Sequence, residues 1–240
     1  MRKVIKVGCC GFPLNRRDYF KKFKLVELQN TFYQPPKRLA TVERLKESVP
    51  SDFEFTLKAF QVITHPASSP TYRRLREEIG RKENFGFFRD TREVFSAWER
   101  TFKIAKVLGA KIVVFQSPRS FRESKESITN LYKFFSRIER DDFILVWEEK
   151  AGFKKTTLKK LCKELDLIYC VDPFKRRPLD CKFHYFRLHG RGGYNYKYSL
   201  RELEELKGML DRDSYVLFNN IYMKEDALRF KDILGKDAQE

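Results

Sequence analysis

The sequence predicts an α/β protein, a single TIM-like (β/α)₈ barrel domain that occupies residues 1–240. Eight short apolar segments recur along the chain, and most are separated by charged segments with the periodicity of a helix. Strands and helices that alternate in this way are typical of a parallel barrel. The length of 240 residues is also typical of this fold when it forms one domain.

The eight expected strands are rich in Val, Ile, Phe and Leu. They are Val4–Cys9, Leu25–Gln29, Phe53–Leu57, Lys111–Gln116, Phe143–Glu148, Leu167–Val171, Phe183–Leu188 and Tyr215–Asn219. The expected helices between them include Leu39–Ser48, Thr91–Leu108, Ser124–Arg137, Thr156–Leu165 and Ser199–Leu210.

Short polar signals mark the expected helix ends. Thr41 precedes VERLKE and Ser124 precedes KESITNLYKFF, as helix N-caps would. Ser199 precedes LRELEELKGML, with Glu202 three residues later, which is the pattern of a capping box. Gly109 follows KVL and is expected to close that helix.

Two connections depart from the regular pattern. The segment from about 59 to 90 is long and carries THPASSP near its start, so we expect an excursion over one end of the barrel. Between Asp172 and Lys182 the proline-rich sequence DPFKRRPLD is too short for a helix. The barrel is therefore expected to be irregular, with a missing helix between its sixth and seventh strands.

The charge balance favours a polyanionic partner. Fifty Lys and Arg stand against 33 Asp and Glu, which gives a formal net charge of +17. Such a balance favours nucleic acid, another phosphorylated ligand or an anionic membrane surface. A heat-loving source would explain the 35% charged content, but proteins from such sources enrich both signs of charge.

Cysteine usage and the N-terminus favour a cytoplasmic protein. The five cysteines include no C-x-x-C pair, which indicates reduced thiols. The N-terminal MRKVIKVGCCGF is typical of a first strand, because Lys6 interrupts its apolar run. No apolar run approaches the roughly 18 residues of a membrane span, so no membrane partner is expected, and no obligate protein partner is evident.

Polar residues follow nearly every expected strand, at the end where barrel enzymes place their chemistry. In chain order they are Glu27, Asn30, Thr31, Tyr33, Lys58, His65, Gln116, Glu148, Asp172, Arg187, His189, Gly190, Asn219 and Asn220. Charged and amide groups that end buried strands need partners. A rim of Glu, Asp, Lys, Arg and His suits general acid–base chemistry on a polar or anionic substrate.

The segment ELQNTFYQPP at 27–36 has the form E-x-N/S-T-F-Y-x-x-P, and there the chain resembles the YecE-like family (domain of unknown function 72). The similar segments that follow are FEFTLKAFQVITHP at 53–66, VVFQSP at 113–118, YFRLHGRGGYNYKYS at 185–199 and YVLFNN at 215–220. This resemblance covers nearly the whole chain and implies a TIM barrel, whereas the activity of the family is not settled. The chain departs from the family's usual G-T-S-G-W with GCCGF at 8–12, and from its usual Glu-Arg with VWEEK at 146–150.

Four strand-end residues are the catalytic candidates: Glu27, Lys58, Glu148 and His189. Glu27, followed by two aromatic residues, could be a general acid or base, or a structural carboxylate of the turn after it. Lys58 could clamp a phosphate together with Arg187, or either cation could form a buried ion pair with Glu27 or Glu148. His189 could transfer protons or bond to the rim.

The predicted substrate-binding residues are Asn30, Thr31, Tyr33, His65, Gln116, Asp172, Arg187, Gly190, Tyr196, Asn219 and Asn220. His65 could shuttle protons, and the backbone amide of Gly190 could cradle an anion. Tyr196 could stack on a nucleotide or pack on the barrel. One asparagine of the pair is expected to orient a substrate, although a strand-end turn also favours Asn.

No metal site is assigned from the sequence. Glu27, Glu148 and Asp172 could hold Mg²⁺ or Mn²⁺ through carboxylate oxygens. The chain has three histidines, never two at helical spacing, and cannot supply a His-rich trinuclear zinc cluster.

The leading hypothesis is an enzyme that acts on a phosphate-bearing substrate by hydrolysis of a nucleic-acid phosphodiester. One alternative is a sugar or sugar-phosphate isomerase or epimerase, which a deep closed pocket would favour over an open basic groove. Another is a non-catalytic nucleic-acid-binding protein, since the fold alone does not choose among these functions.

Overall fold

A computed structural model describes residues 3–236 of the chain. Its eight strands are parallel and close into a barrel in chain order. They are β1 (Ile5–Cys10), β2 (Leu25–Leu28), β3 (Glu54–Lys58), β4 (Ile112–Gln116), β5 (Ile144–Glu148), β6 (Leu167–Val171), β7 (His184–Leu188) and β8 (Ser214–Phe218). The predicted barrel is confirmed, and every predicted strand agrees with an observed one to within one residue at each end.

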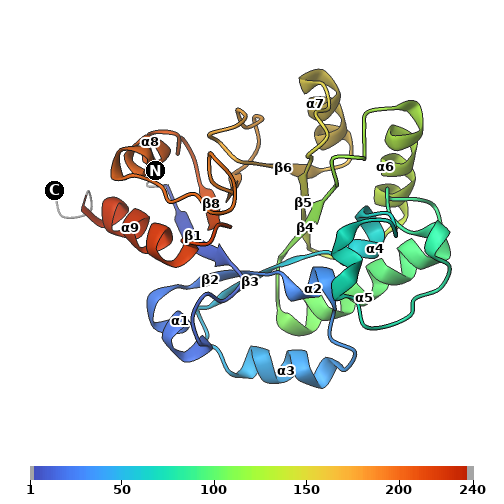
Figure 1. The fold of residues 1–240 in the computed structure, drawn as a ribbon, viewed down its shortest axis with the longest axis horizontal. Helices are drawn as coiled ribbons and strands as arrows, with labels where there is room; N and C mark the ends of the chain where they lie inside the picture. The colour runs from blue at the N-terminus through green and yellow to red at the C-terminus, as the bar shows by residue number, and fades with distance from the viewer. Residues whose placement is uncertain (1–2, 237–240) are drawn as a thin grey trace. The chain divides into compact units, whose positions relative to one another are not determined.

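Helices follow most of the strands (Figure 1). They are α1 (Arg16–Lys22), α2 (Asn30–Tyr33), α3 (Leu39–Glu47), α4 (Gln61–Thr64), α5 (Arg92–Leu108), α6 (Lys125–Arg137), α7 (Lys155–Glu164), α8 (Leu200–Gly208) and α9 (Met223–Lys236). Two short 3₁₀ turns, η1 (Pro70–Arg74) and η2 (Lys82–Asn84), lie between α4 and α5. Among the residues described, no helix combines the length and apolar character that crossing a membrane requires.

Three of the four predicted helix-end signals are confirmed. Ser124 caps α6, Ser199 caps α8 in a capping box with Glu202, and Gly109 ends α5 with a left-handed φ of 70°. The prediction for Thr41 is wrong, because α3 already begins at Leu39 and encloses it. An N-cap side chain accepts from the unpaired backbone N–H groups of the first helical turn. A threonine that already lies within the helix is not in position to do so.

The connection between β6 and β7 contains no helix, as predicted. Asp172 instead starts a turn: its side chain accepts from the backbone N–H of Phe174 at 3.2 Å, and its carbonyl accepts from Lys175 and Arg176. A dozen residues suffice for a crossover between parallel strands. The loop therefore returns the chain without a helical layer.

Residue contacts group the barrel into two compact units, which are described separately. Unit 1 comprises Met1–Glu27, Pro50–Glu54 and Ile168–Glu240, and unit 2 comprises Leu28–Val49 and Phe55–Leu167. The prediction that the chain is a single domain stays a prediction.

In unit 1, α9 lies alongside β1 and β8, with α8 next to it (Figure 1). Phe218 of β8 packs on Phe230 of α9, with ring centroids 6.0 Å apart. Because successive strand side chains point to opposite faces, Leu217 and Asn219 face away from this helix. The register pairs Leu217 with Arg187, so Arg187 also points to the inner face.

In unit 2, aromatic side chains fill the layer between β4 and its helices. Phe115 of β4 packs on Trp98 of α5 and on Phe134 of α6. Gln116, the next residue, therefore points to the inner face. Gln116 is paired in register with Glu148 of β5, which places an amide and a carboxylate side by side.

Candidate functional site

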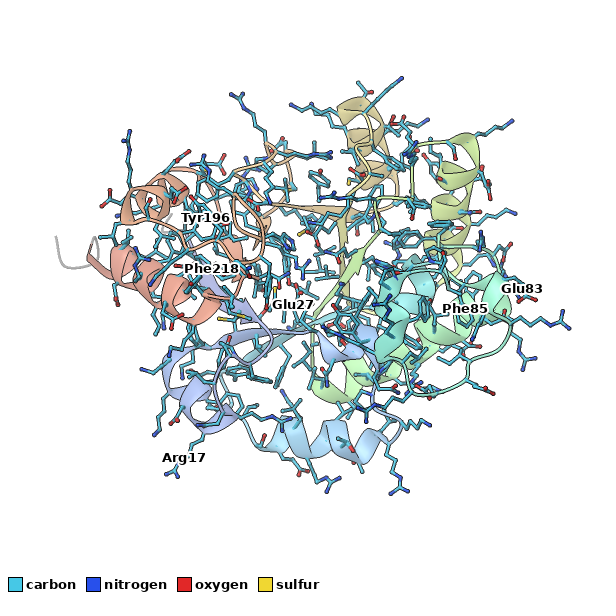
Figure 2. The ribbon with its side chains drawn as sticks, viewed as in Figure 1. Arg17, Glu27, Glu83, Phe85, Tyr196 and Phe218 are labelled. Atoms are coloured by element: carbon cyan, nitrogen blue, oxygen red, sulfur yellow. The ribbon has the colours of Figure 1, made fainter. Side chains whose placement is uncertain are left out.

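Glu27 of β2, which Figure 2 labels, is the centre of a buried polar cluster in unit 1. Arg187 Nη2 lies 2.8 Å from Glu27 Oε1, and both side chains are 0% exposed. The Tyr185 hydroxyl donates to Glu27 Oε2 at 2.8 Å. Both carboxylate oxygens are thus engaged, so the buried ion pair that the sequence allowed between Arg187 and Glu27 is the arrangement observed.

The GCCGF segment shapes this cluster. A Cβ on Gly8 would lie 2.4 Å from the carbonyl oxygen of Leu25, so only glycine lets β1 approach β2 so closely. Gly11 N donates to the carbonyl of Glu27 at 2.8 Å. Arg187 Nη2 lies 3.6 Å from Cys10 Sγ, so the Cys10 thiol borders the guanidinium.

The neighbouring Cys9 thiol is buried and difficult to ionise. Burial raises the pKa of Cys9 to about 12, with a smaller opposing effect from Tyr19. A thiol with this pKa stays protonated near neutral pH and is a poor nucleophile.

His189 lies just beyond β7 and is half-buried. Asn219 Nδ2 lies 3.2 Å from His189 Nδ1, and the backbone N–H of His189 donates to Asp172 Oδ2 at 3.2 Å. An amide NH₂ group only donates, so Nδ1 accepts and the proton of the neutral ring sits on Nε2. The predicted residues Asp172, His189 and Asn219 are therefore brought together in unit 1.

Asn220 and the loop after β7 are held by hydrogen bonds within the protein. Asn220 is 0% exposed, and its Nδ2 donates to the carbonyl of Tyr196 and to Asp226 Oδ2, both at 2.7 Å. The Tyr196 hydroxyl donates to Glu202 of α8 at 2.5 Å. These bonds fasten the loop to α8 and α9, so Asn219 is the member of the asparagine pair positioned beside His189.

Gly190 allows the chain to turn sharply after His189. Its φ is +80°, and a Cβ there would lie 2.2 Å from the carbonyl oxygen of Gly193. Its N–H donates to the Tyr198 hydroxyl at 2.9 Å, so this amide is already used within the protein. Its predicted role in cradling an anion stays a prediction.

Unit 2 holds a second polar cluster, in which side chains of three strand ends form a chain of contacts. Lys58 Nζ donates to Gln116 Oε1 at 2.7 Å, and Gln116 Nε2 donates to Glu148 Oε2 at 2.6 Å. Lys150 Nζ lies 2.5 Å from Glu148 Oε1. Lys58 and Glu148 are buried, whereas Lys150 is partly exposed.

Lys58 and His65 share an aromatic neighbour. Lys58 Nζ lies 3.5 Å from the ring centroid of Phe32, and the His65 ring meets the same phenyl ring edge-on at 4.9 Å. Burial lowers the pKa of His65 to about 3, with a further contribution from the charge of Lys58. His65 is therefore neutral near pH 7, where it offers hydrogen bonds rather than a cation.

The NTFY turn after β2 splits into buried and exposed positions. The Thr31 hydroxyl contacts the carbonyls of Leu28 at 3.0 Å and Lys58 at 2.8 Å, which ties α2 to β3. Asn30 is exposed and Tyr33 is half-buried, and both line a surface hollow. Thr31 thus stabilises the fold through these two bonds, whereas Asn30 and Tyr33 are accessible to a ligand.

Two groups of residues that lie at these sites were not predicted from the sequence. Tyr185 holds Glu27, and its position two residues before Arg187 on the same strand face could have revealed it. The exposed arginines Arg73, Arg74 and Arg76 line the hollow with Tyr33, and only the closely spaced arginines of TYRRLR mark them in the sequence.

The described part of the chain contains no group of three His, Cys, Asp or Glu side chains placed to hold a metal ion. Of the predicted oxygen ligands, Glu27 has both oxygens engaged by Arg187 and Tyr185. Asp172 caps its own turn and accepts from His189.

The fold and its strand-end clusters define a closed parallel barrel with polar side chains at the C-terminal ends of its strands. Within this class the chain belongs to the family described as "Protein of unknown function DUF72", which matches residues 14–240. The resemblance recognised in the sequence is confirmed by this match. A comparison with curated proteins finds no match.

Solved structures share the fold. A DUF72 family protein from Enterococcus faecalis V583 is 19% identical with a TM-score of 0.72, and 98% of each chain is covered. A DUF72 family protein from Thermotoga maritima MSB8 is 23% identical with a TM-score of 0.68, over 97% of this chain and 99% of that one. An AP endonuclease, family 2, from Brucella melitensis is 9% identical with a TM-score of 0.55, over 98% of this chain and 99% of that one.

Proposed function

We propose that the protein is an enzyme that hydrolyses phosphodiester bonds in nucleic acid, with His189 as a hydrogen-bond donor to the phosphodiester. The observation that carries this proposal is the half-buried imidazole of His189, whose Nδ1 accepts from Asn219. That bond fixes the tautomer with the proton on Nε2. A neutral ring in this tautomer can donate a hydrogen bond from Nε2 to a phosphodiester oxygen and stabilise the negative charge that develops there, an effect of about 10²-fold on a rate.

The buried pair behind His189 acts as a support in this proposal. Arg187 and Glu27 are 0% exposed and bonded to one another, so they hold the end of β7 rather than contact substrate. Asp172 positions the histidine backbone, and Asn219 positions its ring. The catalytic roles first predicted for Glu27, Lys58 and Glu148 stay predictions.

Charge and fold likeness support nucleic acid as the substrate class. The formal net charge of +17 favours a polyanion, because neutralised phosphates release counterions. The fold is also similar to that of a protein named as an AP endonuclease. The two sequences are 9% identical, so the likeness supports the fold alone. The chemistry has to be tested separately.

The test measures binding and cleavage of labelled DNA and RNA by the full chain. Substrates are a single strand, a duplex and a duplex with an abasic site, each across a salt series and with Mg²⁺, Mn²⁺ or neither added. His189→Ala removes the donor and is expected to lower the cleavage rate by about 10²-fold and to leave binding nearly unchanged. Binding should weaken steeply as salt is raised.

The matched control is His184→Ala, which alters the histidine at the opposite end of the same strand. His184 Nε2 contacts Asp211 Oδ1 at 2.7 Å, and the proposal gives it no part in the chemistry. Both variants are first checked for cooperative unfolding. Binding that is weak and indifferent to salt would overturn the proposal. Salt-dependent binding without cleavage would identify a non-catalytic binding protein instead.

A further inference from the structure

Unit 2 carries a basic surface hollow that is separate from the strand-end cluster of Lys58, Gln116 and Glu148. The hollow has a volume of about 510 Å³. We call it the arginine hollow, and it is lined by Asn30, Tyr33, Gln34, Arg73, Arg74 and Arg76. It joins the turn after β2 to the η1 turn, and none of its residues is acidic.

The three arginines are not neutralised by carboxylates of the described structure. Arg73, Arg74 and Arg76 are exposed, and none of their guanidinium groups forms an ion pair within residues 3–236. Nearby Arg100 differs, because its Nη1 lies 2.7 Å from Glu77 Oε1. Three adjacent positive charges repel one another, so an anion that enters the hollow would relieve this repulsion.

A network of hydrogen bonds holds the backbone of the hollow in place. The side chain of Gln34 accepts from the backbone N–H of Arg76 at 2.6 Å and donates to Glu77 Oε1 at 2.9 Å. Arg100 binds the same glutamate and donates to the carbonyl of Pro35 at 2.5 Å. The two walls are therefore tied together before any ligand arrives, which lowers the entropy cost of binding.

The hollow also offers a flat aromatic surface. The guanidinium carbon of Arg74 lies 4.4 Å from the ring centroid of Tyr33. The carbonyl of Tyr33 accepts from Gln61 Nε2 at 3.0 Å, which fixes the residue from the inside. Guanidinium planes and tyrosine rings both stack on unpaired bases, and arginine binds phosphate through paired N–H donors.

We propose that the arginine hollow binds single-stranded nucleic acid, with Arg73, Arg74 and Arg76 on the phosphates and the Arg74–Tyr33 pair beneath an unpaired base. The choice of ligand rests on the proposed function, but the hollow needs no part of the His189 site. Single strands are favoured over duplexes because stacking on a side chain requires a base that is free of its partner.

The experiment compares two triple variants of the full chain that lose the same charge. The test variant is Arg73→Gln with Arg74→Gln and Arg76→Gln. The control is Lys159→Gln with Lys160→Gln and Lys163→Gln on α7, where all three side chains are exposed. Fluorescence anisotropy gives the affinity for a labelled oligothymidine and for a duplex of equal length across a salt series.

The test variant is expected to bind the single strand about tenfold or more weakly than the parent, and its slope of log affinity against log salt should fall by about 2. The control should lose about threefold or less, since its charges act only at long range. Tyr33→Leu should weaken single-strand binding and leave the salt slope unchanged.

The possible outcomes distinguish failure of the arginine hollow from failure of the proposed function. Equal binding by the test variant and the control overturns the hollow and leaves the proposed function standing. An equal loss for duplex and single strand overturns the preference for an unpaired base. A parent protein that binds no oligonucleotide overturns both proposals. A hollow that instead binds an acidic peptide, with loss in the test variant, also overturns the nucleic-acid assignment.

Discussion

The end of β7 in unit 1 and the end of β3 in unit 2 use similar residues in different surroundings. Each strand carries a buried cation on its inner face, Arg187 in β7 and Lys58 in β3. A histidine follows each cation, His189 in the first case and His65 in the second. From the sequence alone the two ends offer the same chemistry.

The two strand ends differ in the partners of these residues. Arg187 faces the carboxylate of Glu27, whereas Lys58 donates to the amide of Gln116 and lies over a phenyl ring. His189 is half-buried beside an amide donor, whereas His65 is buried with a pKa of about 3. Burial and partners therefore distinguish the two histidines, and residue type does not.

The largest effect is expected from breaking the buried pair at the β7 end. Arg187→Met leaves the charge of Glu27 without its guanidinium, and the free energy of unfolding should fall by about 3–5 kcal/mol. The double variant Glu27→Gln with Arg187→Met should lose less, because no uncompensated charge remains. Urea denaturation of the parent, both single variants and the double variant measures this coupling. A single variant as stable as the parent would show that the pair contributes no stability.

The β3 end should respond to pH through His65. Its pKa is about 3 in the folded protein and close to 6.5 in the unfolded chain, so the unfolded chain binds a proton as the pH falls below about 6.5. Stability is thus lost on acidification, by about 2.5 kcal/mol between roughly pH 7.5 and pH 4.5. The stability of His65→Asn should depend less on pH by that amount. Parallel stability curves for parent and variant would contradict the lowered pKa.

Glycine-to-alanine variants test whether the turns that follow β3 and β7 require glycine. Gly86 has a φ of +81°, and a Cβ there would lie 2.4 Å from the carbonyl carbon of His65. Gly190 after β7 is similarly constrained, whereas Gly192 meets its nearest atom at 3.4 Å and has no positive φ. Gly86→Ala and Gly190→Ala should each lose about 2 kcal/mol, and Gly192→Ala much less. Thermal unfolding measures all three, and equal losses would refute the steric argument.

The smallest effect concerns the helix that follows the β7 loop. Ser199 and Glu202 form a capping box at the start of α8. Ser199→Ala should lower the free energy of unfolding by about 1 kcal/mol, because an N-cap acceptor is lost. Ser199→Thr keeps the acceptor and should change stability by only a few tenths. If both variants lose the same amount, the cap bond contributes nothing.

The barrel was predictable because its strands are short apolar segments between polar ones, and eight of them occur in order. Four helices, α1, α2, α4 and α9, were given no bounds from the sequence, although α9 packs on β1 and β8. Local signals also failed for Thr41, where a capping residue type lies inside a helix. Sequence patterns identify which segments are apolar, but they do not show where a helix starts when its cap lacks a polar side chain.

Only part of the candidate site was predictable. The strand ends were located correctly, because polar residues at the end of an apolar run stand out. The sequence left open whether Arg187 pairs with Glu27 or binds a ligand, since that depends on contacts between residues far apart in the chain. The three arginines of the hollow went unnoticed because exposed charge is common on protein surfaces.

The β6–β7 crossover has a consequence for handling this protein. Within residues 3–236 it is the one connection between successive strands that holds no helix, and Lys175, Arg176 and Arg177 are exposed on it. A trypsin cut after Lys175 would sever the backbone without interrupting any helix or strand. Separately produced halves ending and starting there would each keep whole strands, so this loop is the natural place to split the chain for fragment complementation.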